Sequence, residues 1–293
     1  MLIINLKGGM GNQMFQYALA AIIAKRNNTE LFIDKSFFRI AGVTQHTSRN
    51  FELKVFNNDY KEASSEQKMI FRKLSFTNQI KKKLKLNYPK TYYEQSFSFN
   101  PEILKLKTPL YLNGYFQSYR YLSGDEIFIK SQFEFSSQKL DENNYRLLNA
   151  IKKYNSISVH IRRGDYVNDQ STQKFHGNCG LAYYREALDY FMKEKKAILF
   201  FFSDDIAWVK QNFNTLSYNK VFVDQNKNEN SWKDMLLMSS CKHNIIANSS
   251  FSWWAAWLNS YKNKIIIAPK IWFANPDQER KTEDLIPREW IRL

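Results

Sequence analysis

Short apolar runs that alternate with helical patterns are the feature that most limits the folds open to this 293-residue chain. The runs are rich in β-branched and aromatic residues, and the segments between them have the length and spacing of helices. This alternation is typical of βαβ units, and strands that are apolar throughout are typical of a parallel sheet covered on both faces. We therefore predict a doubly wound, Rossmann-like domain over residues 155–270. Its predicted strands are Ile157–Ile161, Ile198–Phe202, Val221–Val223, Ile245–Ala247 and Ile265–Ala268, and its predicted helices are Leu181–Lys193, Ile206–Phe213, Trp232–Cys241 and Phe251–Ser260.

The first half of the chain begins with the same pattern and then becomes irregular. Its predicted elements are the strands Leu2–Leu6, Leu31–Asp34 and Leu110–Phe116, a glycine-rich turn at residues 8–12 and the apolar helix Gln13–Lys25. A charged helical segment, Asp141–Lys153, leads into the second half. We therefore expect two domains, residues 1–150 and residues 151–293, with the packing of the last residues left open.

The chain carries 43 basic and 28 acidic residues, and its net charge of +15 favours anionic partners. Nucleic acid, a membrane surface and a phosphorylated substrate all fit that charge. Two cysteines are too few for a disulfide framework or a cysteine-rich zinc site. The longest apolar run, Ala18–Ala24, is too short to span a bilayer, and the first residues lack the features of a signal peptide. We therefore expect a cytoplasmic protein.

Residues 68–90 hold eight basic residues and no acidic one. Ile70, Leu74, Ile80 and Leu84 fall near helical spacing within this segment, with basic residues on the other faces. A basic amphipathic helix either lies on an anionic membrane surface or packs on its own domain with its charges in solvent. The sequence leaves both open, and the first would place the protein peripherally on the inner membrane.

Polar residues follow nearly every predicted strand. Ligands of open parallel sheets bind beyond the carboxyl ends of the strands, so these residues are candidates for one site. Paired arginines offer bidentate donors to a diphosphate, serines at a helix start bind anions, and aspartates accept hydrogen bonds from a base or a ribose. Taken singly, each has a structural alternative, such as a solvated surface arginine or a helix cap. The candidates are Arg162, Arg163, Ser203, Asp204, Asp205, Asn248, Ser249 and Ser250, with His160 inside a strand and Gly9, Gly11 and Asn12 near the start of the chain.

Five segments together resemble the bacterial α-1,2-fucosyltransferases of glycosyltransferase family 11. They are GGMGNQMFQYA at 8–18, HIRRGDY at 160–166, HGNC and LAYY within 176–184, FSDD at 202–205 and ANSSFSWWAAWL at 247–258. The resemblance implies an α/β, GT-B-like fold in which two Rossmann-like domains face a central cleft. It also implies inverting transfer of L-fucose from GDP-fucose to the 2-hydroxyl of a terminal galactoside in a surface glycan such as an O-antigen. No cofactor and no metal are implied.

The resemblance also implies roles for single residues. Arg162 is expected to hold the leaving β-phosphate, His160 to lie beside the nucleotide, and Asp204 or Asp205 to bind the guanine. Asp165 is a candidate for the general base, and orienting one of the arginines is its alternative role. His176 is expected near the acceptor. The other expected donor contacts are Gly9, Gly11, Asn12, Arg163, Ser203, Asn248, Ser249, Ser250 and Phe251.

Several alternatives stay open at this point. The same fold supports another linkage or another acceptor, and a lipid-linked acceptor is one of these. A polyanion- or RNA-binding protein would also explain the charge, but no RNP motif, KH loop or helix-turn-helix is visible, so we expect no nucleic-acid partner. His176 and Cys179 do not complete a zinc site, and Asp204–Asp205 is not a metal-binding DxD motif, so we expect no metal.

Overall fold

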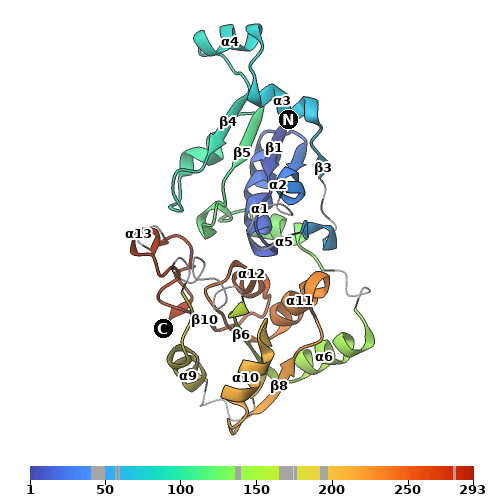
Figure 1. Cartoon of the computed structure of the whole chain (residues 1–293), viewed down its shortest axis with the longest axis vertical. Helices are drawn as coiled ribbons and strands as arrows, with labels where there is room; N and C mark the ends of the chain where they lie inside the picture. The colour runs from blue at the N-terminus through green and yellow to red at the C-terminus, as the bar shows by residue number, and fades with distance from the viewer. Residues whose placement is uncertain are drawn as a thin grey trace. The chain divides into compact units, whose positions relative to one another are not determined.

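A computed structural model describes residues 1–293 except 41–49, 57, 59, 136–139, 165–173, 175–176, 192–196 and 280–281. The chain divides into two compact units (Figure 1). Unit 1 is Met1–Glu134 with Lys281–Leu285, and unit 2 is Phe135–Arg280 with Ile286–Leu293.

The predicted boundary between residues 150 and 151 falls within helix α6 (Glu142–Lys153), and this whole helix lies inside unit 2. Its buried Asn144 donates to Asn226 at 2.9 Å and accepts from the same side chain at 2.8 Å. These buried hydrogen bonds link α6 to the segment after strand β8 (Asn219–Val223). Unit 2 therefore begins ahead of this helix.

Unit 1 contains a five-stranded parallel sheet in the order β3-β2-β1-β5-β4. The chain winds from the central β1 outward to β3, crosses the sheet, and fills the other side with β4 and β5. The topological switch point of this sheet is therefore between β1 and β5. Its elements are β1 (Leu2–Asn5), α1 (Met10–Arg26), β2 (Leu31–Asp34), α2 (Ser36–Ile40), β3 (Lys61–Glu62), α3 (Ser65–Arg72), α4 (Phe76–Lys83), β4 (Lys90–Tyr93), β5 (Leu110–Asn113) and α5 (Glu126–Gln132), with 3-10 turns at Leu53–Val55, Pro101–Lys105 and Tyr119–Tyr121.

The predicted strands β1, β2 and β5 and the apolar helix α1 are confirmed, and the limits of β1, α1 and β5 differ from the predicted ones. Helix α1 already begins at Met10, because extended Gly9 (φ −79°, ψ 179°) serves as its N-cap. Gly11 and Asn12 therefore lie in the first helical turn and not in a loop. Strand β5 ends at Asn113, well before the predicted limit, because Phe116 has a left-handed backbone with φ +54°.

Unit 2 contains a six-stranded parallel sheet in the order β11-β10-β9-β6-β7-β8. The chain winds from β6 to β8 on one side and then returns to β9 on the other, so its switch point is between β6 and β9. The doubly wound domain is confirmed. Its elements are α6, β6 (Asn155–Ile161), α9 (Leu181–Tyr190), β7 (Ala197–Ser203), α10 (Ile206–Phe213), β8, α11 (Trp232–Ser240), β9 (His243–Ile245), α12 (Ser250–Leu258), β10 (Ile266–Ala268), α13 (Pro276–Glu279) and β11 (Ile291–Arg292), with a 3-10 turn at Asn228–Asn230.

Strand β9 is His243–Ile245 and therefore begins and ends two residues earlier than the predicted Ile245–Ala247, because two buried polar residues carry the ladder. His243 accepts a hydrogen bond from the backbone of Ile265 at 3.0 Å, and Asn244 donates to Ser158 at 2.7 Å. Because both residues are polar, they do not extend the apolar run from which the strand was predicted. The tryptophans Trp253 and Trp254 on α12 are fully buried and belong to the core of unit 2. Among the described residues, no helix combines the length and apolarity needed to cross a bilayer.

Candidate functional site

The unit 2 switch point brings the predicted arginine and aspartate pairs together. Arg162 and Arg163 follow β6 directly, and Asp204 and Asp205 follow β7. The two strands are paired in register up to Ile161 and Ser203, so both pairs leave the sheet at the same edge.

Each carboxylate orients one guanidinium. Arg162 Nη1 lies 2.8 Å from Asp204 Oδ2, and Arg163 Nε lies 3.3 Å from Asp205 Oδ2. Asp204 Oδ1 also accepts from the backbone N–H of Arg163 at 2.8 Å, and the Arg163 guanidinium lies 3.9 Å from the ring centroid of Trp208. About a quarter of the Arg162 and Asp204 side chains is exposed, so the pair is ordered and still reachable from solvent. Asp205 additionally caps α10 by accepting from the N–H of Trp208 at 3.1 Å.

Gly164 makes room for this arrangement. A Cβ at this position would lie 2.7 Å from Asp204 Oδ2, closer than real Cβ contacts come. Any side chain here would therefore displace the carboxylate that orients Arg162. This role could not be predicted from the sequence, because Gly164 and Asp204 meet only across the neighbouring strands β6 and β7.

His160 is buried in β6 and keeps an unused polar atom. Its Nδ1 finds no hydrogen-bond partner among the described residues. Burial lowers the pKa of His160 to about 4, and the charge of Arg162 adds to this effect while Asp204 opposes it. The imidazole is therefore neutral at neutral pH, and its ring centroid lies 5.8 Å from that of Phe251.

The segment between β9 and α12 serves mainly to shape the edge. Asn248 is buried and donates to the carbonyls of Gly177 at 3.3 Å and Trp272 at 3.1 Å. Ser249 caps α12 by accepting from the N–H of Phe251 at 3.3 Å, and Ser250 is the first residue of that helix. The helix start and its backbone N–H groups thus lie at the same switch point as the arginines.

In unit 1, Asn12 lies beside the switch-point strands. Its Oδ1 accepts from Gln117 Nε2 at 2.6 Å. Gly8 has φ +76°, and a Cβ there would lie 2.5 Å from Asn12 Nδ2. The neighbouring Gln13 is buried, donates to the carbonyl of Asn50 at 2.8 Å and accepts from the N–H of Glu52 at 2.9 Å. This structural role gives no signal in the sequence.

Two predicted site residues, Asp165 and His176, lie outside the described residues. In the part of the chain that the structure describes, no three His, Cys, Asp or Glu side chains are grouped as metal ligands. Cys179 and Cys241 are free thiols.

Comparisons with known proteins agree with this architecture. The chain is 36% identical to "O-antigen biosynthesis glycosyltransferase WbnK" of Escherichia coli, over 98% of this chain and 99% of the relative. It is 35% identical to "Alpha-1,2-colitosyltransferase" of Escherichia coli, over 98% and 97%. A shorter match, 35% identical over 47% of this chain and 38% of the relative, is the human "Galactoside alpha-(1,2)-fucosyltransferase 1".

The fold is shared with a solved structure. The crystal structure of POFUT1 in complex with GDP gives a TM-score of 0.52 at 12% identity, covering 90% of this chain and 97% of that chain. This likeness and the two parallel sheets confirm the predicted GT-B-like α/β fold. The family model described as "Glycosyl transferase family 11" matches residues 1–293. The chain therefore belongs to glycosyl transferase family 11, a family of glycosyltransferases.

Proposed function

We propose that this enzyme transfers L-fucose from GDP-fucose to the 2-hydroxyl of a terminal galactoside in a surface glycan, with inversion at the anomeric carbon. Unit 2 would bind the donor and unit 1 the acceptor. The family and the names of the relatives support the transfer of a fucose-type sugar with α-1,2 linkage. The observation that carries the proposal is the pair of oriented arginines at the unit 2 switch point.

The chemistry needs fixed positive charge at this place. The bond between the sugar C1 and the GDP oxygen breaks through an oxocarbenium-like state, so negative charge grows on the diphosphate. Arg162 and Arg163 are already oriented by their carboxylates, and each presents N–H donors to that charge without reorganisation. The N–H groups at the start of α12 add a favourable site for a phosphate oxygen.

Other residues keep proposed roles beside the arginines. Neutral His160 offers its free Nδ1 to the nucleotide without adding charge. Asp204 and Asp205 remain the candidates for guanine recognition, although both already bind an arginine. The new bond forms between the acceptor 2-oxygen and C1, and the acceptor proton passes to a base, for which we propose Asp165. No metal enters this mechanism.

The test is a panel of galactose-terminated disaccharides incubated with GDP-fucose, followed by linkage analysis of the product. We expect an α-1,2-linked fucoside, and Arg162→Ala should abolish it. Arg146→Ala is a matched control, because Arg146 lies exposed on α6 and, among the described residues, forms its ion pair with the exposed Glu142. Absence of product from every acceptor, or full activity of Arg162→Ala, would overturn the proposal.

A second donor has one specific observation in its favour. The 35% identical Escherichia coli relative is named a colitosyltransferase, so GDP-colitose belongs in the same assay. A turnover ratio above about tenfold for one donor decides between the two sugars. The α-1,2 linkage and the role of the arginines are the same in either case.

Membrane contact through residues 68–90 is the remaining part of the proposal. The structure divides this segment into two helices instead of one, because Ser75 begins α4 by accepting from the N–H of Asn78 at 3.3 Å. Helix α3 is tied to the sheet, since Lys68 lies 3.1 Å from the buried Asp34. Helix α4 buries no residue, and Figure 1 shows it standing clear of the unit 1 sheet.

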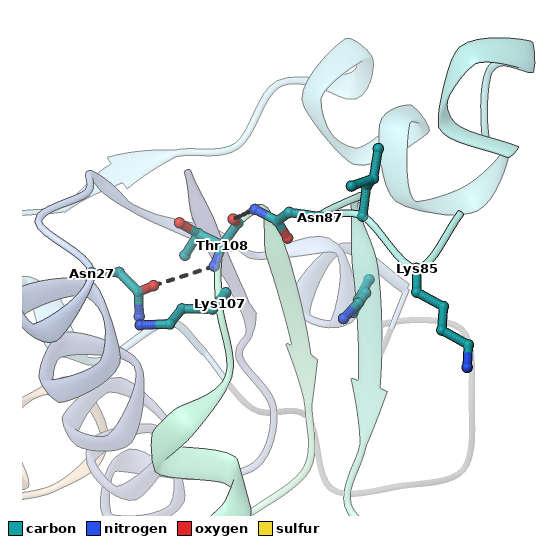
Figure 2. A pocket seen from close by; sticks show the side chains of 7 residues that line it. Asn27, Lys85, Asn87, Lys107 and Thr108 are labelled. Atoms are coloured by element: carbon teal, nitrogen blue, oxygen red, sulfur yellow. Dashed lines mark hydrogen bonds between the residues drawn. The ribbon is translucent and has the colours of Figure 1, made fainter. Parts of the chain in front are cut away.

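The surface around α4 combines apolar and basic groups. Phe76 is 76% exposed and Leu84 is 64% exposed, and Lys81–Lys83 form the last turn of the helix. A pocket of about 430 Å³ lies beside it, and its described lining contains three lysines and no acidic residue (Figure 2). Its lining residues are Asn27, Lys85, Leu86, Asn87, Lys90, Lys107 and Thr108. Apolar side chains that insert between lipids, with cations at the phosphate level, fit an anionic phospholipid surface.

Liposome sedimentation tests this contact. The parent protein should bind vesicles with anionic lipid, and Lys81→Glu, Lys82→Glu and Lys83→Glu together should release it, because each basic residue near the surface contributes about 1 kcal/mol. A control with the same charge change reverses the exposed Lys152, Lys153 and Lys262 of unit 2. Equal release by both triple variants, or no binding by the parent, would refute the role of α4.

A further inference from the structure

The carboxyl edge of the unit 1 sheet carries a second set of polar side chains that the proposed mechanism does not use. Lys7 follows β1, Glu94 follows β4, and Tyr115 follows β5. Strands β1 and β5 are the two strands that flank the unit 1 switch point, where open α/β sheets bind ligands.

Contacts across the strands hold these residues together. Lys7 Nζ donates to Asn113 Oδ1 at 3.2 Å and lies 4.5 Å from the ring centroid of Tyr115. Glu94 accepts from the backbone N–H of Tyr115 at 2.6 Å and of Phe116 at 2.8 Å. One carboxylate therefore fixes the turn that follows β5.

This turn is strained and is held in place. Phe116 has φ +54° and is only 1% exposed, a conformation that costs energy and persists only when its surroundings enforce it. Gly114 allows the close approach, because a Cβ there would lie 2.4 Å from Glu94 Cβ. Strained, over-determined turns of this kind cluster at binding and catalytic sites.

Polar atoms at this edge remain free for a ligand. The Tyr115 hydroxyl has no hydrogen-bond partner among the described residues, and only one of the three Lys7 donors is used. Gln117 uses its amide N–H on Asn12, which leaves its carbonyl oxygen as an acceptor in the described structure. Lys7 and Glu94 are both half-buried and do not form an ion pair with each other. Burial lowers the pKa of Lys7 and raises the pKa of Glu94.

We infer that Lys7, Tyr115 and Gln117 form the subsite that binds the hydroxyl groups of the galactoside acceptor, and that Glu94 is the positioning residue of this subsite. The inference rests on the proposed function. The subsite combines donors on Lys7 and Tyr115, an acceptor on Gln117 and the aromatic ring of Tyr115. A ligand with ring hydroxyls and an apolar C–H face requires groups of these kinds. A nucleotide diphosphate would need more fixed cations than this edge supplies.

Two variants test the contact residues. Tyr115→Phe removes only the hydroxyl and should raise the acceptor KM about tenfold, while Lys7→Met keeps the stem and should raise it about 10- to 100-fold. The dissociation constant of GDP should stay within twofold in both. Tyr93→Phe is the matched control, because Tyr93 is 58% exposed on the neighbouring β4 and should keep the parental KM.

Glu94→Gln tests the positioning role, because Tyr115 and Phe116 donate to different oxygens of Glu94 and the substitution turns one of these oxygens into an NH2 donor. We expect a higher acceptor KM with unchanged GDP binding, and a general unfolding defect would instead weaken both. The inference is overturned if the parent enzyme transfers sugar to a galactoside while Tyr115→Phe, Lys7→Met and Glu94→Gln keep its acceptor KM. Failure of the proposed function is different and visible separately, since the parent would then transfer no sugar to any galactoside.

Discussion

The contact between Gly164 and Asp204 gives a sharp test of the unit 2 site. In Gly164→Ala the added methyl group would lie 2.7 Å from Asp204 Oδ2 and 3.1 Å from its Cγ. Asp204 would then have to move. It would lose its contact with the guanidinium of Arg162, which is 2.8 Å in the parent, and its hydrogen bond from the backbone N–H of Arg163. The substitution thus misplaces Arg162 without removing any charge.

The expected effects on activity and on stability differ in size. One preorganised donor to developing charge is worth about 10²- to 10³-fold in kcat, so we expect a fall of about 100-fold. The ion pair is partly exposed, and pairs of that kind contribute only about 0.2–1 kcal/mol to folding. Steady-state kinetics with a saturating disaccharide acceptor, together with a denaturant melt, measures both quantities on one preparation.

Gly180→Ala provides the control for this experiment. Gly180 is the N-cap of α9 with φ −73°, and a Cβ there would meet no atom of the described residues within 4 Å. Alanine is a poorer N-cap than glycine, so this variant should lose about 0.5–1 kcal/mol of stability and keep its kcat. If Gly164→Ala keeps its kcat within threefold of the parent, Asp204 does not position a group that the reaction needs.

Three further results are expected. Arg162→Lys should lose most activity, because an ammonium lacks the bidentate fork of the guanidinium; near-parental turnover in a kinetic assay would refute this. Activity should persist after dialysis against EDTA, and a loss that Mn²⁺ or Mg²⁺ restores would contradict the metal-free mechanism. Burial raises the pKa of Asp234 to about 7, so its ionisation lowers stability as pH rises from about 4 to about 7. Asp234→Asn should therefore have a larger free energy of unfolding than the parent at pH 8, by up to about 4 kcal/mol, and the same one as the parent at pH 4. Equal unfolding free energies of the two proteins at both pH values would refute the burial argument.

The sequence predicted best the elements that are buried on every side. Strands β6 and β7 consist mostly of buried residues. The unbroken apolar run Ile198–Phe202 marks β7 in the sequence, and the alternating Ile157, Val159 and Ile161 mark β6. The adjacent polar residues were then predicted to share an edge, because parallel strands end on the same side. The structure does bring Arg162, Arg163, Asp204 and Asp205 together.

Elements with mixed surroundings could not be predicted in the same way. Strand β3 is fully exposed and only two residues long, and β4 has exposed residues at both ends, so neither stands out from the irregular stretch around it. Glu94 gave no signal either. Its partners are the backbone N–H groups of Tyr115 and Phe116, some twenty residues further along the chain, which only pairing of β4 with β5 brings into reach.

Both units use glycine in the same way at their switch points. Gly8 leaves room for Asn12, Gly114 for Glu94, and Gly164 for Asp204. In each case the glycine comes soon after a strand that flanks a switch point. The space that it leaves is filled by a polar side chain from another part of the edge. The polar side chain is thereby held close to the backbone, where it interacts with a neighbouring group of the protein instead of with solvent and orients that group. Rigid placement of this kind lowers the cost of ordering a bound ligand, so the two edges are suited to bind substrates with little local rearrangement.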